Sequence, residues 1–579
     1  MKTRKASWWW AGRLSQRALD KRCTWRQDPR IWWPQTRCTH CQSIHPVLNI
    51  AMPPGLGPIN MFSSLLGDLS ERGVLSGYQK FVVGLEPILK DMSERGVPVS
   101  PERWAAVRAE LERDYAATEA SMQALVPDEV KPFHPKNGYK RPPVMDEGEG
   151  DGTYLLKKFE DGDERWVKLD PWKPSLAGLV RYMKHRGHPV PKDWKSDKET
   201  TNEQELERLA NRTKDPLYDC VLSYRQIGTI LNNHIPNWEP DAGGRVHPVF
   251  YYEPGTGQLA SRRPNAQNAP KHGKGSKKEL ADAFRSMIQP RKGHTLLEFD
   301  YRSFHAQTLA FEAGDADYLR LAKLDIHSYL TAHLVRHPER HRLLGLSDDE
   351  LADRLGEIKE AHGFVRDYKA KRAILGYGFG MGWKKLYMMN RESFDSQADA
   401  KRVVDMLNGL FPKACAWRDA VRKQAHEQGY LLSRFGCIRW FWEVLRWQGG
   451  EWRSGGDDSE AAVAFLPAND AFCHIKEAML RLDRAPVMCG AGAVHDGSLL
   501  KKYGLINQIH DALMFECPDE LVDEALAAVP EEMERPSLVL VSNICPGGLS
   551  VEVSASRSSE NWSKMEKVKC LRKNETVIA

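Results

Sequence analysis

An apolar stretch near the end of the chain, INQIHDALMFECPDE at 506–520, constrains the fold more than any other feature. Apolar residues alternate with other residues on both sides of the pair His510-Asp511, which is the pattern of two strands joined at a tight bend. A polar pair at the tip of an apolar hairpin has two interpretations. It is an ordinary polar turn, or it presents the Asp511 carboxylate to a metal ion. The stretch alone favours neither.

A second carboxylate follows another apolar strand in LLEFDYRSFHAQTLAFEAGD. The strand runs from Leu296 to Phe299, ends in Asp300 and is followed by an apolar helix. A single carboxylate does not hold a catalytic Mg²⁺ tightly, so Asp511 needs a partner, and Asp300 is the best candidate. The alternative is that Asp300 caps the helix, a position that aspartate also favours.

A basic helix is predicted in RDYKAKRAILGYGFGMGWKKLY. Lys371, Leu375 and Phe379 are spaced four residues apart and fall on one helix face. Lys369 and Arg372 add positive charge, and the glycines that follow allow close backbone approach. A cationic face beside paired carboxylates is suited to holding a triphosphate during an in-line displacement driven by two metal ions. The alternative is a solvated basic helix.

A basic segment, YEPGTGQLASRRPNAQNAPKHGKGSKK at 252–278, is rich in Arg, Lys, Asn and Gln. These side chains contact phosphates and groove edges in nucleic-acid complexes. An ordinary basic loop has the same composition, and composition alone favours that interpretation.

The bulk composition limits the class of protein. A chain of 579 residues with 41% hydrophobic and 28% charged residues can bury several cores, so we expect two to four domains or subdomains. Its 11 cysteines, an odd count, indicate reduced thiols in a cytosol-like compartment. The sequence lacks a long apolar run of the kind that predicts a membrane span. A net charge of +5 permits nucleic-acid binding without showing it.

Residues 1–77 differ in composition from the rest of the chain. Cys38 and Cys41 form a CxxC pair with Cys23 and His45 nearby, which is a weak signal for zinc. The alternative is an irregular or disordered segment. A basic beginning whose first acid is Asp20 also fits a transit peptide.

The remaining pattern is mostly helical. We expect two helices between 78 and 126, separated at Gly96, and a loop or small excursion over 134–165. Further helices follow before the strand HTLLEFD, and 304 to about 430 is expected to be largely helical. A long helix over 459–483 is expected to be interrupted around Pro467.

Taken in order, these segments resemble the family A DNA polymerases, the DNA polymerase I-like group, and most closely its phage members. The resemblance covers about 78–562, and its motifs occur in the family's order. The matching segments are TGQLASRRPNAQNAP (256–270), FDYRSFH (299–305), DIHSYLTA (325–332), KRAILGYGFGMG (371–382), RFGCIRWF (434–441), QIHDALMFE (508–516) and ENW (560–562).

The resemblance implies an α+β right-hand polymerase with a helical thumb, an antiparallel-sheet palm and helical fingers. The implied boundaries are an atypical N-terminal segment at 1–77, thumb 78–250, palm 251–335 and 455–562, fingers 336–454 and a C-terminal tail 563–579.

It also implies the roles of individual residues. Asp300 and Asp511, with the backbone of Tyr301, would bind two Mg²⁺ ions, and His510 would lie beside the primer end. The residues implied to contact the incoming dNTP are His305, His327, Arg366, Lys371, Leu375 and Phe379. Those implied to contact DNA are Gln258, Arg263, Asn265, Gln267 and Gln508.

The chain departs from the family pattern in several places. Asp367 stands where the family has an arginine four residues before the helix lysine, and Arg366 lies one position away. His305 replaces the glutamate that crowds the sugar 2′ position, so sugar discrimination is the least secure inference. The other departures are Leu375 for an aromatic residue, Phe379 for a tyrosine, Gln258 for the arginine of TGRL and Ala468 for a glutamine.

A second His-Asp pair, His495-Asp496, has Gly, Ala and Ser neighbours and no comparable strand after it, so Asp511 is preferred. Relatives commonly carry a 3′–5′ exonuclease domain ahead of the thumb. We find no convincing acidic exonuclease motif in the first 77 residues, so we expect no proofreading by this chain.

The main prediction is a template-directed DNA polymerase of a phage or phage-derived genome, in the cytoplasm of a bacterial host or phage-infected cell. Its expected partners are primer–template DNA, dNTPs and a processivity or replisome protein, with no membrane. One alternative is a single-subunit RNA polymerase. Another is a non-catalytic primer–template-binding remnant, whose salt-sensitive DNA binding would persist without turnover.

Overall fold

The computed structural model describes residues 25–27, 35–38, 44–46, 67, 70–71 and 73–572, apart from 140–153, 160–161, 194–195, 254–256, 271–275, 485 and 489–493. The chain divides into two compact units, Met1–Ser76 and Gly77–Ala579. In the first unit, three antiparallel strands form a sheet, β1 (Trp25–Gln27), β2 (Gln35–Cys38) and β3 (Ile44–Pro46). The side chains considered for zinc, those of Cys23, Cys38, Cys41 and His45, lie outside the described residues.

The second unit is built around a five-stranded sheet in the order β18-β19-β11-β20-β21, with every neighbouring pair antiparallel. The central strand is buried because Leu296, Leu297 and Phe299 expose no surface, as expected of a continuous apolar run. The strands are β11 (His294–Tyr301), β18 (Leu505–Ile509), β19 (Ala512–Pro518), β20 (Val553–Ser558) and β21 (Glu566–Val568).

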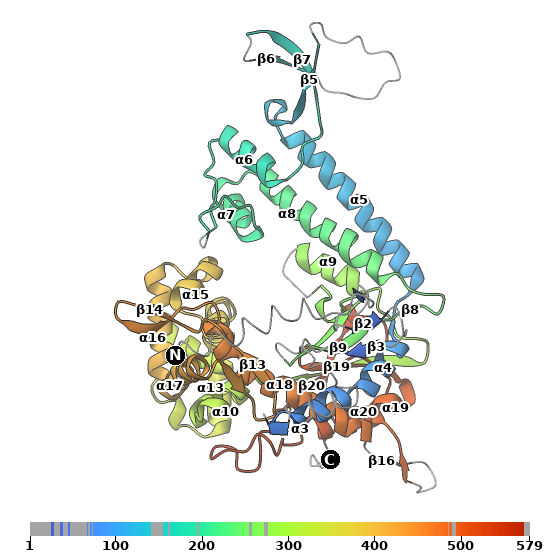
Figure 1. Ribbon diagram of the computed structural model, residues 1–579, viewed down its shortest axis with the longest axis vertical. Coiled ribbons are helices and arrows are strands. Elements are labelled where there is room, and N and C mark those ends of the chain that lie inside the picture. Colours follow the sequence, from blue (N-terminus) through green and yellow to red (C-terminus); the bar gives the residue numbers. More distant parts are fainter. Residues whose placement is uncertain are drawn as a thin grey trace. The chain divides into compact units, whose positions relative to one another are not determined.

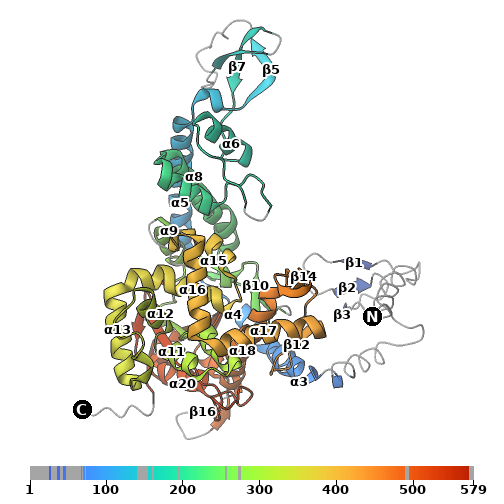
Figure 2. The ribbon, with the colours of Figure 1, turned by 90° about the vertical axis from the view of Figure 1, so that its left-hand side faces the viewer.

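Helix α20 (Val522–Glu534) supports this sheet, and α18 (Ser459–Arg484) packs against α20 (Figure 2 labels both helices). Helix α20 packs against β11, β19 and β20, and α18 packs against α20 and α10 (Phe304–Ala313). The predicted interruption of α18 is wrong, because the helix continues through Pro467. An interior proline costs about 3 kcal/mol. Here most of the helix is buried on both sides of the proline, and that packing holds it together.

An elongated helical region extends from this sheet (Figure 1). Helix α5 (Pro101–Leu125) lies along α8 (Pro216–Thr229), and Ser100 caps α5 by accepting the Arg103 N–H at 3.2 Å. This region has its own apolar core around Met122, Trp172 and Leu179. Its other helices are α6 (Leu176–His185) and α7 (Glu203–Thr213), whereas α4 (Glu86–Arg95) packs beside strand β18 of the five-stranded sheet.

A three-stranded antiparallel sheet stands beyond the far end of α5 (Figure 1). Of the two expectations for 134–165, a loop or a small excursion, the loop is wrong and the small excursion agrees with this sheet. Val167 and Leu169 are buried and alternate with exposed or half-buried neighbours, but the many charged residues obscure this period in the sequence. The strands are β5 (Phe133–Tyr139), β6 (Tyr154–Lys158) and β7 (Glu164–Leu169), in the order β5-β7-β6.

The part between 326 and 428 is helical, as expected. Ser347 and Glu350 form a capping box that begins α13, and His362 kinks the same helix. The helices are α12 (Ile326–Leu334), α13 (Asp348–Val365), α14 (Lys371–Gly378), α15 (Trp383–Met389), α16 (Gln397–Leu410) and α17 (Pro412–Gln428). Two hairpins follow, β12 (Tyr430–Leu432) with β13 (Ile438–Trp440), and β14 (Leu445–Gln448) with β15 (Glu451–Ser454).

Short elements complete the second unit. Strand β4 pairs with β8, β9 with β10, and β16 with β17. Their bounds are β4 (Val97–Pro98), β8 (Arg245–Val246), β9 (Val249–Tyr252), β10 (Leu259–Arg262), β16 (Pro486–Met488) and β17 (Val494–Asp496). The helices are α9 (Ser276–Arg285), α11 (Ala316–Leu324) and α19 (Leu499–Lys502), and α3 (Leu75–Tyr78) lies where the two units join.

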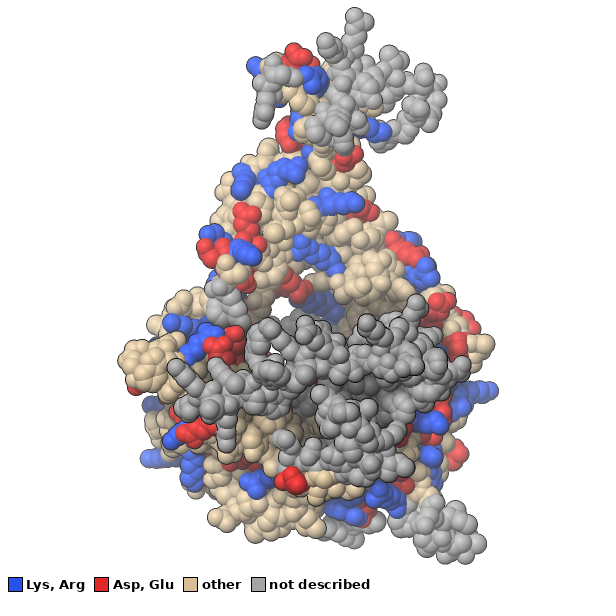
Figure 3. Space-filling model, viewed as in Figure 1, with Lys and Arg blue, Asp and Glu red and all other residues tan. Residues whose placement is uncertain are grey.

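Basic and acidic side chains are interspersed over the visible face of the second unit (Figure 3). Within the described part of the chain, no helix combines the length and the apolar character needed to cross a membrane.

Candidate active site

The predicted hairpin exists, and it brings the two carboxylates together. Strands β18 and β19 are joined by a two-residue turn, His510-Asp511. Strand β11 pairs with β19 so that Asp300 lies opposite Ala512, and the Tyr301 N–H donates to the Asp511 carbonyl at 3.5 Å. Asp300 belongs to β11, whereas Ser303 occupies the N-cap position of α10, so the helix-cap interpretation of Asp300 is wrong.

The carboxylates perturb each other. Burial raises the pKa of Asp300 to about 8, with the neighbouring Asp511 and Glu298 carboxylates adding to the shift. No group of three or more acidic, histidine or cysteine side chains in the described part of the chain is arranged to hold a metal ion. The pair Asp300 and Asp511 nevertheless offers the oxygen donors that a hard divalent cation prefers, and such a cation would offset the repulsion between them. The residues present therefore fit the Mg²⁺ ions that the resemblance implies.

Glu298 was missed by the sequence analysis. It lies two residues before Asp300, so the period of a strand places both on one face of the sheet. The Trp562 Nε1–H donates to the Glu298 carboxylate at 3.0 Å and holds it in place. The alternation in LEFD was the signal that could have identified it.

The turn that carries Asp511 is held rigidly. His510 has a φ of 57°, the positive value that tight hairpin turns require. The Gln258 side-chain amide lies 3.1 Å from His510 Nδ1, and the Gln508 amide donates to the His510 carbonyl at 2.5 Å. These contacts join the basic segment to the hairpin tip.

The predicted DNA-contacting residues divide into two groups. Gln267 and Gln508 are buried, and the Gln267 amide donates to the Gln508 carbonyl and side-chain oxygen at 3.0 and 2.9 Å. In this structure they fix the hairpin against the basic segment. Arg263 and Asn265 are exposed, and the Asn265 side chain accepts the N–H groups of residues 267 and 268 at 3.2 Å.

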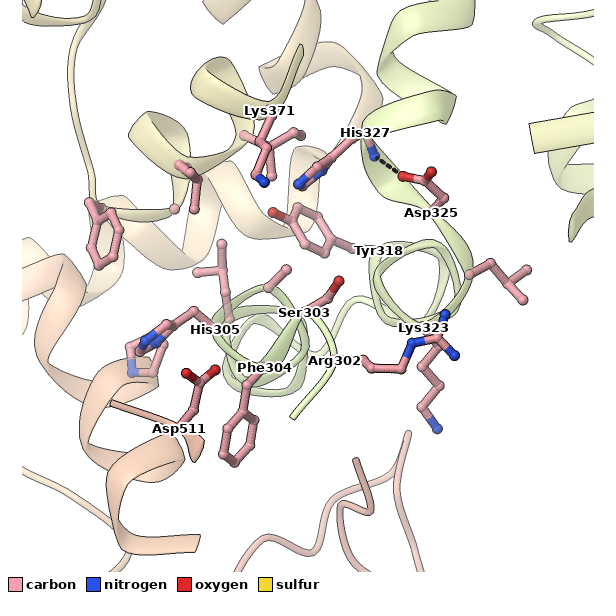
Figure 4. A pocket seen from close by; sticks show the side chains of 18 of the residues that line it. Arg302, Ser303, Phe304, His305, Tyr318, Lys323, Asp325, His327, Lys371 and Asp511 are labelled. Atoms are coloured by element: carbon pink, nitrogen blue, oxygen red, sulfur yellow. Dashed lines mark hydrogen bonds between the residues drawn. The ribbon is translucent and has the colours of Figure 1, made fainter. Parts of the chain in front are cut away.

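A cavity of about 440 Å³ opens beside Asp511 (Figure 4). It is lined by residues of α10, α12, α14 and α18, which are far apart in the sequence. Ala468 also lies on its wall. The cavity brings together all six residues predicted to contact a nucleotide, His305, His327, Arg366, Lys371, Leu375 and Phe379.

Both histidines of the cavity are held neutral. Burial lowers the pKa of His305 and of His327 to about 4. The Nδ1 atom of each is buried and finds no hydrogen-bond partner in the described part of the chain. His305 packs beside Phe379 and Phe472, with ring centroids 6.0 and 5.7 Å apart.

The cations of the basic helix have different partners. The Arg366 guanidinium pairs with Asp325 at 2.8 Å, and Asp325 also caps α12 by accepting the His327 N–H at 3.1 Å. Lys369 pairs with Asp399 at 2.5 Å, and Arg372 pairs with a glutamate, so neither adds free charge. No carboxylate of the described residues pairs with Lys371, which faces the cavity.

The structure does not test the choice of Asp511 over Asp496. His495 and Asp496 lie in β17, but their side chains are outside the described residues.

Comparison with known proteins agrees with this geometry. Residues 178–343 match the profile of DNA polymerase family A. The chain is 26% identical over 482 residues to the thermostable DNA polymerase I of Thermus filiformis, covering 82% of this chain and 48% of that protein. It is 25% identical over 327 residues to the chloroplastic/mitochondrial DNA polymerase I A of Arabidopsis thaliana, covering 55% of this chain and 28% of that protein.

A solved structure shares the fold. The POL domain of Pol1 from M. smegmatis, in complex with DNA primer–template and dNTP, superimposes with a TM-score of 0.62 at 18% identity. The match covers 87% of this chain and 74% of that one. This chain spans about half or less of the length of the curated relatives.

The fold is therefore that of an α+β right-hand polymerase, as predicted. The chain is similar to the family A DNA polymerases, whose profile matches residues 178–343. The expected closeness to phage members is not supported by these relatives and stays a prediction.

Proposed function

We propose that this protein is a template-directed DNA polymerase that adds dNMPs to a primer 3′-hydroxyl. The observation that carries the proposal is the meeting of Asp300 and Asp511 beside a cavity lined by Lys371 and His327. The similarity to family A DNA polymerases and the shared fold with the POL domain support it.

The carboxylates of Asp300 and Asp511 and the backbone of Tyr301 would hold two Mg²⁺ ions. When bound, such ions lower the pKa of the primer hydroxyl and neutralise charge on the triphosphate and the leaving pyrophosphate. The Asp300 carboxyl, whose pKa is about 8 without metal, gives up its proton to become a ligand.

The rest of the cavity positions the nucleotide. Lys371 supplies an unpaired positive charge for the phosphates, and a neutral His327 ring can donate one N–H to a phosphate oxygen. His305 and Phe379 form the wall beside the sugar and base. The substitution of histidine for the family's glutamate makes His305 the residue expected to set sugar discrimination.

Primer–template DNA would lie along the basic segment and the hairpin tip. The exposed Arg263 and Asn265 are proposed as contacts to the duplex. Gln258 and His510 are proposed to support the primer end, while Gln267 and Gln508 position them from the interior. We keep the division into thumb 78–250, palm 251–335 and 455–562, and fingers 336–454 as a proposal.

Extension of a labelled primer on a DNA template with Mg²⁺ and dNTPs tests the function. Wild type is expected to extend the primer, and Asp511→Ala to lose extension by at least about a thousandfold, because a metal-holding carboxylate acts in the transition state. Asp496→Ala is the matched control, because it removes the aspartate of the other His-Asp pair. Loss in Asp496→Ala with activity in Asp511→Ala would show that the wrong pair was chosen.

The same assay separates the alternatives. Incorporation of rNTPs in preference to dNTPs would support the RNA-polymerase interpretation. DNA binding without any extension would support the non-catalytic remnant. The expectation of no proofreading is checked with a mismatched primer end, from which Asp300→Ala/Asp511→Ala protein should release no nucleotides.

A further inference from the structure

Three more cations line the cavity besides Lys371 and Arg366. Lys323 lies in the last turn of α11, Lys359 lies on α13, and Arg302 follows β11. All three line the same cavity as Lys371 and His327 (Figure 4 labels Lys323 and Arg302). Arg302 is neutralised by Glu552 at 2.6 Å.

Lys323 and Lys359 differ from the other cations of the cavity. Both are exposed, and no carboxylate within the described ranges pairs with either. Lysine presents a compact charge on a flexible stem, so each ammonium can follow a moving phosphate group. Neither residue lies in the segments that resemble the family motifs, so neither could be selected from the sequence.

The cavity has a local shortage of positive charge that these lysines can correct. Asp367, an acid, stands four residues before Lys371 and pairs with Arg366 at 2.9 Å. Arg366 also pairs with Asp325. Arg366 is therefore shared between two acids, whereas no carboxylate of the described residues pairs with Lys371.

We propose that Lys323 and Lys359 form a second phosphate-binding end of the cavity. This end takes the outer phosphates of the incoming dNTP and then holds the pyrophosphate as it leaves toward solvent. Asp511 lines the cavity where bond formation would occur, and the two lysines lie on its exposed part. The inference rests on the proposed polymerase function. The two lysines would supply the positive charge that the helix lacks because Asp367 stands where the family has an arginine.

Binding of inorganic pyrophosphate with Mg²⁺, measured by isothermal titration calorimetry on the full chain without DNA, tests this inference. The double variant Lys323→Gln/Lys359→Gln is expected to bind pyrophosphate about fivefold to tenfold more weakly than wild type, since exposed charge contacts are individually modest. The corresponding arginine variant should bind as wild type does. Lys423→Gln on α17 is the matched control, because Lys423 is an exposed lysine outside the cavity.

The kinetic counterpart is a rise in KM for dNTP in the glutamine double variant with a smaller change in kcat. Equal pyrophosphate affinity in wild type and the double variant would overturn the inference, as would the absence of saturable binding by wild type. Because the titration needs no turnover, it separates the two proposals. Wild type that extends primers while the double variant keeps full pyrophosphate affinity would refute only the lysine site.

Discussion

At the scale of single residues, Asp300 makes the metal-free protein sensitive to pH. Its folded pKa of about 8 lies above the value near 3.9 of an unfolded aspartate, so the fold favours the protonated form. The stability from this preference is complete below about pH 4 and is lost as the pH rises toward 8. We expect Asp300→Asn, in EDTA at pH 8, to raise the free energy of unfolding by roughly 1–3 kcal/mol.

Denaturant unfolding at pH 5 and pH 8 checks this expectation. The stabilisation by Asp300→Asn should be larger at pH 8, and Mg²⁺ should stabilise wild type more than the variant, because binding to the folded state shifts the equilibrium. Glu520→Gln, an exposed acid of the short turn after β19, is a suitable control. A variant that is equally or less stable than wild type at pH 8 would contradict the buried-carboxylate account.

His327 leads to a second residue-scale prediction. Because burial lowers its pKa to about 4, the ring is neutral throughout the range from pH 6 to pH 8. We expect the KM for dNTP to show no titration near pH 6.5 in primer-extension kinetics. A KM that rises across this pH, and loses that rise in His327→Gln, would show that His327 binds the phosphates as a cation.

At the scale of elements, helix α7 ends in a residue that is poorly suited to its backbone. Lys214 at the C-cap has a φ of 55°, a left-handed conformation that glycine adopts without a steric cost. The side chain is exposed, so little contact is lost on removing it. We expect Lys214→Gly to stabilise the protein by about 0.5–1 kcal/mol in thermal unfolding.

Lys214→Ala separates conformation from charge, because alanine removes the ammonium but keeps the Cβ. It should not stabilise the protein. Equal stabilisation by alanine and glycine would assign the effect to the lost charge instead of the backbone.

Elements with a clear pattern of apolar residues were predictable from the sequence. The hairpin around Asp511 and strand β11 follow from their apolar patterns, and their meeting follows once both carboxylates are assigned to one metal site. The bond between Gln267 and Gln508 was not predictable, because the two residues are 241 positions apart and are brought together only by the folded sheet. The sheet β5-β7-β6 was missed because charged residues mask its alternation, and continuous burial carries α18 through Pro467.

At the scale of the whole molecule, the second unit holds every residue of the proposed site. The main apolar core of this unit contains residues from Phe81 to Cys570, and the unit also contains Asp300, Lys371 and Asp511. A chain lacking residues 1–66, which keeps α3 intact, is therefore expected to fold and to extend primers at a rate within about twofold of the full chain, since a compact unit with its own apolar core can fold alone.

Circular dichroism melting and primer extension on the two proteins measure this. The control is the same truncation carrying Asp511→Ala, which should melt normally but extend nothing, so that residual activity is assigned to this site. A truncated chain that melts several degrees lower would mean that the N-terminal unit stabilises the polymerase unit. A truncated chain that melts normally but binds primer–template more weakly would instead assign a DNA-binding role to residues 1–66, whose basic beginning carries no acid before Asp20.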